Sequence, residues 1–143
     1  MAAAVRTHLK ASDVLIMAAA PSDFRPAITR DAKVPRSTGG FSLAFEPTDD
    51  ILLSTLPERH ARLTLVGFAL ETGAAVEKGR AKLARKQLDL IVINDAFEPG
   101  AGFDVDSIAV TILDCLGGEQ HVPLQSKARV AEAILDAIES YRG

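Results

Sequence analysis

The chain has 143 residues, of which 48% are hydrophobic and 24% charged, a composition typical of one globular domain with its own core. A formal net charge of −3 excludes a general attraction to nucleic acid or anionic membranes, so any basic feature has to be local. The single cysteine cannot form an internal disulfide and no run approaches the roughly 18 apolar residues of a membrane-spanning helix, so we expect a cytoplasmic protein.

Hydrophobic periodicity and turn residues divide the chain into alternating helices and strands. In chain order we expect a helix over 2–10, a strand over 13–19, a long loop over 20–40, a strand over 41–45, a short helix over 49–56, a strand over 63–68, a helix over 74–87, a strand over 90–93, a loop over 96–106, a hairpin of 108–113 with 120–124, and a helix from 126 to about 141. Thr48 and Ser126 are the expected N-caps of the helices that follow them. Cys115 lies in an apolar run and is expected to be buried.

The strand segments 13–19, 63–68 and 90–93 are continuous apolar runs, which are typical of a parallel sheet covered by helices on both faces. The final pair of strands, joined through Gly117 and Gly118, predicts an antiparallel hairpin. The expected fold class is therefore α/β, a layered and mostly parallel sheet that ends in a hairpin.

In a parallel sheet, ligands bind beyond the carboxyl ends of the strands. The turn after the first strand, from Ala18 to Asp23, carries mostly small side chains, so a flat ligand could lie against its main chain. Asp23 would offer a carboxylate to a metal, a hydroxyl or an amine. The alternative is a tight turn in which Asp23 pairs with Arg25.

Two basic features could hold anions. Lys78, Lys82 and Lys86 recur at intervals of four, so a helix places them in one stripe that could bind several phosphates; a solvated helix face is the alternative. The segment from Lys33 to Arg36 lies in the long loop and suits a lid over an anionic intermediate, or else an ordinary charged loop. The sequence contains no glycine-rich phosphate loop of the common types, no nucleophile elbow and no metal-ligand spacing of His and Cys.

Six motifs in order resemble the phosphopantothenate–cysteine ligase family of coenzyme A biosynthesis, also called phosphopantothenoylcysteine synthetase. They are MAAAPSDFRP from Met17, Lys33 ten residues after Asp23, TDDIL, VGFALET, the lysines of KGRAKLARKQLDLIVIND, and GFDVD before the hairpin. The resemblance runs from about residue 12 to the C-terminus and implies a Rossmann-like sheet. In bacteria this domain is usually fused to a decarboxylase, which would bring FMN.

The resemblance implies an amide-forming reaction driven by a nucleoside triphosphate. The carboxylate of 4′-phosphopantothenate would attack CTP (or ATP) to give an acyl-cytidylate and pyrophosphate, and the amine of cysteine would then displace CMP. Positioned lysines and Mg²⁺ assist steps that pass negative charge through a site, and Asp23 is the candidate Mg²⁺ contact. The family also implies a homodimer.

The same resemblance assigns the site residues. Lys33 is the implied catalytic residue, in the family's mobile active-site loop. The implied nucleotide-binding residues are Met17, Ala18, Ala19, Asp23, Lys33, Asp49, Asp50, Ile51, Leu52, Phe68, Lys82 and Lys86. Two positions depart from the family pattern: Lys-x-Lys-Lys is here Lys33-Val34-Pro35-Arg36, and proline is usual where Asp49 stands.

The family's N-terminal strands, glycine-rich triphosphate loop and intermediate-binding asparagine have no counterpart in this sequence. We therefore expect residues 1–143 to be a single domain, the C-terminal portion of a ligase domain with its N-terminal strands missing, and inactive alone. A non-catalytic nucleotide-binding or dimerisation module is the main alternative. An NAD(P)-type oxidoreductase is a third reading, disfavoured because the dinucleotide glycine fingerprint is missing.

Overall fold

The structure is a computed structural model that describes residues 1–29, 32, 40, 42–95 and 106–143. In that part of the chain the helices are α1 (Ala2–Leu9), α2 (Ile51–Thr55), the 3-10 helix η2 (Leu56–Glu58), α3 (Ala75–Arg85) and α4 (Lys127–Arg142). The strands are β1 (Val14–Met17), β2 (Phe24–Pro26), β3 (Phe45–Pro47), β4 (Thr64–Glu71), β5 (Leu90–Asp95), β6 (Ser107–Asp114) and β7 (Glu119–Ser126). None of the helices in these ranges is both long and apolar enough to cross a membrane.

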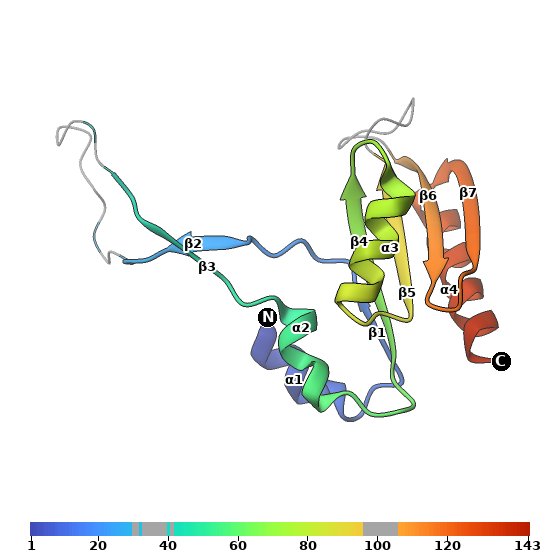
Figure 1. Cartoon of the computed structure of the whole chain (residues 1–143), viewed down its shortest axis with the longest axis horizontal. Coiled ribbons are helices and arrows are strands. Elements are labelled where there is room, and N and C mark those ends of the chain that lie inside the picture. Colours follow the sequence, from blue (N-terminus) through green and yellow to red (C-terminus); the bar gives the residue numbers. More distant parts are fainter. Residues whose placement is uncertain (30–31, 33–39, 41, 96–105) are drawn as a thin grey trace.

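Five strands form the main sheet in the order β1-β4-β5-β6-β7 (Figure 1). The first three are parallel, with Met17 beside Gly67 and Gly67 beside Ile91, whereas β6 and β7 are antiparallel to their neighbours. The α/β fold class with a C-terminal hairpin is confirmed. The carboxyl ends of β1, β4 and β5 point the same way, which is the arrangement that creates a ligand crevice.

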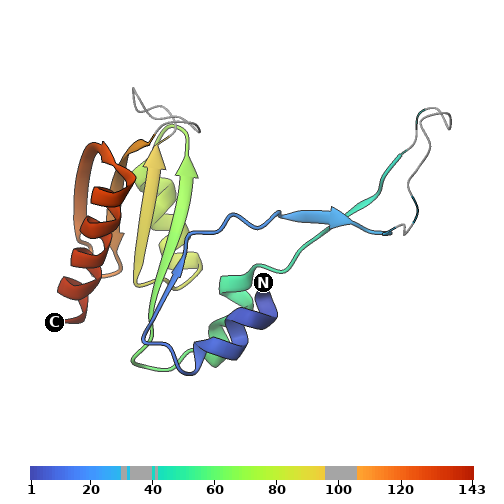
Figure 2. The ribbon, with the colours of Figure 1, turned by 180° about the vertical axis from the view of Figure 1, so that it is seen from behind.

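Helices cover both faces of this sheet, as the continuous apolar strands predict. On one face α3 packs with α1 and α2 over a core whose largest contributions come from the strand residues Leu65, Ile91, Ile93 and Leu113. On the other face α4 covers a second core, to which it contributes Val130, Ile134 and Ile138. Figure 2 shows α4 in front of the sheet and α3 behind it.

Strands β2 and β3 form a separate antiparallel ribbon that projects from the body of the molecule (Figures 1 and 2). Phe24 pairs with Pro47 and Pro26 with Phe45, and between them Arg25 forms an ion pair with Glu46 at 2.8 Å. The expectation of an unstructured loop over 20–40 is therefore wrong for 24–26, and the strand expected over 41–45 instead spans Phe45–Pro47. Arg25 pairs across the ribbon, so the tight-turn alternative with Asp23 does not form.

The N-cap of one helix agrees with the prediction, whereas the N-cap of α2 and the position of the cysteine differ from it. Ser126 caps α4 as expected, by accepting a hydrogen bond from the Arg129 amide at 3.3 Å. Thr48 does not cap α2, because Asp50 takes that position. Cys115 is exposed rather than buried, since it lies in the turn between β6 and β7.

Candidate functional site

A cleft of about 120 Å³ opens where the end of β1, the start of α2, and strand β4 meet. It is lined by Met17, Ala19, Pro21, Ser22, Asp23, Thr48, Asp49, Asp50, Ile51, Leu52, Phe68 and Lys86. Segments some 50 residues apart in the chain thus share one hollow beside the carboxyl end of β1, where a parallel sheet is expected to hold its ligand.

The cleft gathers most of the residues that the sequence predicts for the site. Of the eleven predicted binding residues that the structure describes, all but Ala18 and Lys82 line it. Lys33 lies outside the described residues. Pro21, Ser22 and Thr48 line the cleft without having been predicted, although they belong to the same two motifs, AAAPSD and TDD.

Hydrogen bonds hold the two sides of the cleft together. The Thr48 amide donates to the Asp23 carbonyl at 2.8 Å, and the Thr48 hydroxyl donates to the Ser22 carbonyl at 2.5 Å. The turn after β1 is therefore tied to the segment that leads into α2.

Gly67 lies on β4 and pairs with Met17 of β1. It has no room for a side chain, because a Cβ at this position would lie 2.5 Å from Cδ1 of Leu88.

The cleft combines carboxylates with one lysine. Asp23, Asp49 and Asp50 line it, and the Lys86 ammonium lies 2.9 Å from Oδ2 of Asp50. Oδ1 of Asp50 accepts the amide hydrogen of Leu53 at 3.2 Å and so caps α2. Partial burial raises the pKa of Asp50, but the hydrogen bonds from Lys86 and Leu53 outweigh it and bring the net pKa below its usual value.

The three lysines of the predicted stripe are all engaged, so the stripe is not a freely solvated helix face. Lys78 donates to the Thr72 carbonyl at 2.5 Å, and Lys82 forms an ion pair with Glu71 at the end of β4. Lys86 reaches the cleft through Asp50. The row therefore runs from the end of β4 down to the cleft.

Carboxylate oxygens are the protein ligands that Mg²⁺ prefers, and it usually takes one or two of them together with substrate phosphates. The three aspartates of the cleft fit that donor chemistry. Within the described ranges, no group of three or more His, Cys, Asp or Glu side chains is arranged to hold a metal ion by itself. The arrangement suits a cation that arrives with a phosphate-bearing ligand.

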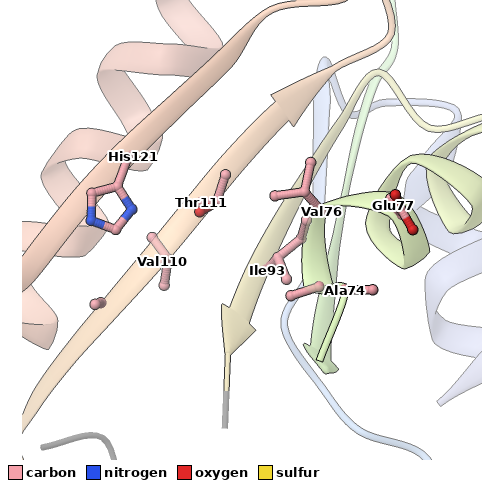
Figure 3. A pocket seen from close by; sticks show the side chains of 9 residues that line it. Ala74, Val76, Glu77, Ile93, Val110, Thr111 and His121 are labelled. Atoms are coloured by element: carbon pink, nitrogen blue, oxygen red, sulfur yellow. The ribbon is translucent and has the colours of Figure 1, made fainter. Parts of the chain in front are cut away.

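A larger hollow of about 310 Å³ lies elsewhere, between the start of α3 and strands β5 to β7 (Figure 3). Ala74, Val76 and Glu77 line it from one side, and Thr111 and His121 from the other. None of the predicted site residues within the described ranges lines it. It is mostly lined by small and apolar side chains, so the smaller cleft is the better candidate on chemistry.

The fold is a Rossmann-like α/β domain, and its candidate ligand cleft lies beside the carboxyl end of β1. The family model described as "DNA/pantothenate metabolism flavoprotein C-terminal domain" matches residues 1–141. The chain belongs to this family.

Relatives and solved structures agree with that placement. The coenzyme A biosynthesis bifunctional protein CoaBC of Bacillus subtilis is 42% identical over 138 residues, which are 96% of this chain and 34% of that protein. A cysteine/cysteine sulfinic acid decarboxylase from an unknown prokaryotic organism is 38% identical over 126 residues, which are 88% of this chain and 35% of that protein. The crystal structure of a CoaBC C-terminal domain superposes with a TM-score of 0.75 at 31% identity, covering 97% of this chain and 59% of that one.

The chain spans about a third of the length of the curated relatives that it matches. The activity of those longer proteins therefore comes to this chain only as a proposal.

Proposed function

We propose that this chain is the C-terminal portion of a phosphopantothenate–cysteine ligase domain, a single domain over residues 1–143 that binds the nucleotide in coenzyme A biosynthesis. The observation that carries the proposal is the shared cleft of Asp23, Asp50, Phe68 and Lys86, four residues from four segments. The family membership and the 42% identity to a CoaBC protein support it. The proposed nucleotide is CTP, and the proposed co-substrates are 4′-phosphopantothenate and cysteine.

The cleft offers each part of a nucleotide a suitable neighbour. Met17 ends β1 and Ala19 lies two residues beyond it, where the small side chain of Ala19 lets a base approach the main chain. Phe68 is 41% exposed and presents an aromatic face to the same space. Asp23 can accept hydrogen bonds from ribose hydroxyls, and Lys86 can balance phosphate charge.

The carboxylates of the cleft would repel a triphosphate unless a cation lies between them. Asp23 and Asp49 are the residues that would contact Mg²⁺ together with the phosphates of the ligand; when it is bound, the cation supplies charge neutralisation and a template for phosphate orientation. Lys33 remains the proposed catalytic residue, at a position outside the described ranges. An FMN-dependent activity would belong to a fused decarboxylase.

Isothermal titration calorimetry with CTP and with ATP, in the presence of Mg²⁺, measures nucleotide affinity and so tests this function. We expect the chain to bind CTP, and Lys86→Met to weaken that binding about tenfold or more because it removes the charge while keeping most of the stem. Lys10→Met, which removes an exposed ammonium outside the cleft, is the matched control and should leave affinity unchanged. The proposal fails if the chain does not bind CTP.

Turnover separates the ligase from its alternative. Pyrophosphate release after addition of CTP, 4′-phosphopantothenate and cysteine would assign catalysis to these 143 residues. Binding of CTP without release would instead favour a module that contributes the nucleotide pocket, which is the activity that we expect for the chain tested alone.

We also propose a homodimer. The β2–β3 ribbon supports it, because strand pleating puts Phe24, Pro26, Phe45 and Pro47 on one face, opposite the Arg25–Glu46 pair. Phe24 is 61% exposed and Phe45 59% exposed. An isolated two-stranded ribbon with a bare apolar face is marginally stable in water, so a second copy is the natural cover.

A further inference from the structure

Lys82 and Lys86 lie one helical turn apart on α3 but have different partners. Lys86 meets Asp50 inside the cleft, whereas Lys82 meets Glu71 at the carboxyl end of β4. Residues at i and i+4 share one helix face, with Cβ atoms about 6 Å apart. Lys82 therefore continues the line of cationic groups from the cleft toward the end of the sheet.

Glu71 is an unusual partner because it is buried. The residue is only 8% exposed, although it ends a strand. A buried carboxylate is costly unless an opposite charge compensates it. Its Oε1 atom is buried and has no partner of good hydrogen-bond geometry among the described residues, so the nearby Lys82 ammonium is its compensation.

The pair has one fixed end and one open end. The side chain of Glu71 is 10% exposed, while that of Lys82 is 38% exposed. An ammonium group carries three donors, and an ion pair with one carboxylate oxygen leaves donors for a further partner. The remaining donors of Lys82 stay accessible, and the buried carboxylate restricts a side chain that would otherwise sample many rotamers.

We propose that Glu71 is a positioning residue: it fixes the Lys82 ammonium at the end of β4, with its free donors available to the phosphate chain of a nucleotide held in the cleft. This inference rests on the proposed function of the cleft. Glu71 itself touches no ligand in this scheme and acts through Lys82.

Whether Glu71→Gln raises or lowers the affinity for CTP shows whether Glu71 positions Lys82. Glu71→Gln keeps the side-chain volume and adds one net positive charge near the ligand. If Glu71 were merely a nearby negative charge, its removal would strengthen the binding of a polyanion. If Glu71 positions Lys82, the same change weakens CTP binding several-fold despite the more positive surroundings.

Calorimetry with CTP and Mg²⁺ on the wild type and on variants measures this change in affinity. The matched control is Glu119→Gln, which removes the β7 carboxylate of an exposed ion pair with Arg80 of α3, 3.0 Å apart. That variant makes the same charge change and should not weaken binding. Thermal unfolding of each variant identifies any loss of fold, and the titrations are made well below the lowest unfolding midpoint.

A double-mutant cycle shows whether Glu71 acts through Lys82. In a Lys82→Met background, Glu71→Gln should produce no further loss of CTP affinity. If Glu71→Gln alone does not fold, Glu71→Asp retains the charge but retracts it by one methylene, and it too should weaken binding.

The binding measurements distinguish failure of the positioning role of Glu71 from failure of the proposed nucleotide binding. Absence of CTP binding by the wild type removes the proposed function and this inference together. Binding that Lys86→Met weakens, but that Glu71→Gln strengthens or leaves unchanged, overturns the positioning role alone.

Discussion

Asp89, at the end of the sheet opposite the cleft, shows how much one side chain can organise. Its carboxylate accepts hydrogen bonds from Arg59 at 2.6 and 2.7 Å and from the Leu65 amide at 2.7 Å. The Tyr141 hydroxyl donates to it at 2.9 Å and lies 3.3 Å from Sγ of Cys115. The hydrogen bond with Cys115, burial and the Asp89 carboxylate all raise the pKa of Tyr141. The network joins β4, β5, α4 and the segment after η2.

Replacing Asp89 should cost more stability than replacing any solvated carboxylate. Asp89→Asn leaves Arg59 without its counter-charge and weakens two further hydrogen bonds, so we expect the free energy of unfolding to fall by about 3 kcal/mol. Urea denaturation measures it. Asp136→Asn, at an exposed position on α4, is the control and should change stability by less than about 0.5 kcal/mol. Equal unfolding midpoints for the two variants would contradict the account.

The contribution of Asp50 to stability should depend on pH in the acid range. Because its pKa in the folded protein lies below the ordinary value of 3.8, its stabilising contribution is present above that value and is lost as the pH falls below it. The stability difference between the wild type and Asp50→Asn should therefore be constant from about pH 7 to pH 5 and shrink below about pH 4. Urea unfolding across this range tests it; a difference that grows in acid would be the opposite sign.

Which residues line the cleft was predictable from the sequence where a motif was long. It was not predictable which of several neighbouring residues takes a given structural role. The small residues after β1 and Phe68 of the VGFALET motif lie where the pattern puts them. The run Thr48-Asp49-Asp50 offers three residues that can all cap a helix, and only packing selects Asp50. The apolar residues around Cys115 predict burial, although the residue lies in the exposed turn between β6 and β7.

At the scale of elements, α3 depends on a close approach to the sheet. A Cβ on Gly79 would lie 2.1 Å from Cδ1 of Ile93, a buried side chain on β5. The absence of a side chain thus sets the distance between α3 and the strands, and with it the reach of Lys82 and Lys86.

Gly79→Ala should therefore destabilise the protein even though alanine favours helix. The overpacking cost of about 1–3 kcal/mol exceeds or offsets a propensity gain of about 1 kcal/mol. Thermal unfolding should show a lower midpoint for Gly79→Ala, and a clear rise would contradict the close packing. Ala81→Ser, at an exposed position of the same helix, is the control and should move the midpoint little.

Strands β1, β4, β5 and β6 were predictable because each contains an apolar run, whereas β7 was predictable from its place after the Gly117–Gly118 turn. Strands β2 and β3 were not, because they are three residues long, contain prolines, and pair across some 20 residues of chain. Their stabilisation is mutual rather than local, so the local pattern predicted no strand at Phe24–Pro26 and placed the other strand over 41–45, where it overlaps β3 only at Phe45.

At the scale of the whole molecule, we predict that substitutions in the projecting β2–β3 ribbon change the oligomeric state. Phe24→Ser combined with Phe45→Ser removes the largest apolar groups of its exposed face, so a dimer should become a monomer. Sedimentation velocity of the wild type and the variant measures it. Leu116→Ser, which changes a residue 82% exposed at the β6–β7 turn, should leave the dimer intact. A wild type that is monomeric at all concentrations would contradict the proposed homodimer.

The central claim is that the turn after β1, the start of α2, Phe68 and Lys86 surround one nucleotide, and amide chemical-shift mapping of the ¹⁵N-labelled chain with CTP and Mg²⁺ tests it most directly. We predict shifts at Ala19, Asp23, Asp50 and Phe68, which line the cleft. Shifts confined to the larger hollow, at residues such as Ala74 and Thr111, or no shifts at saturating CTP, would contradict the account.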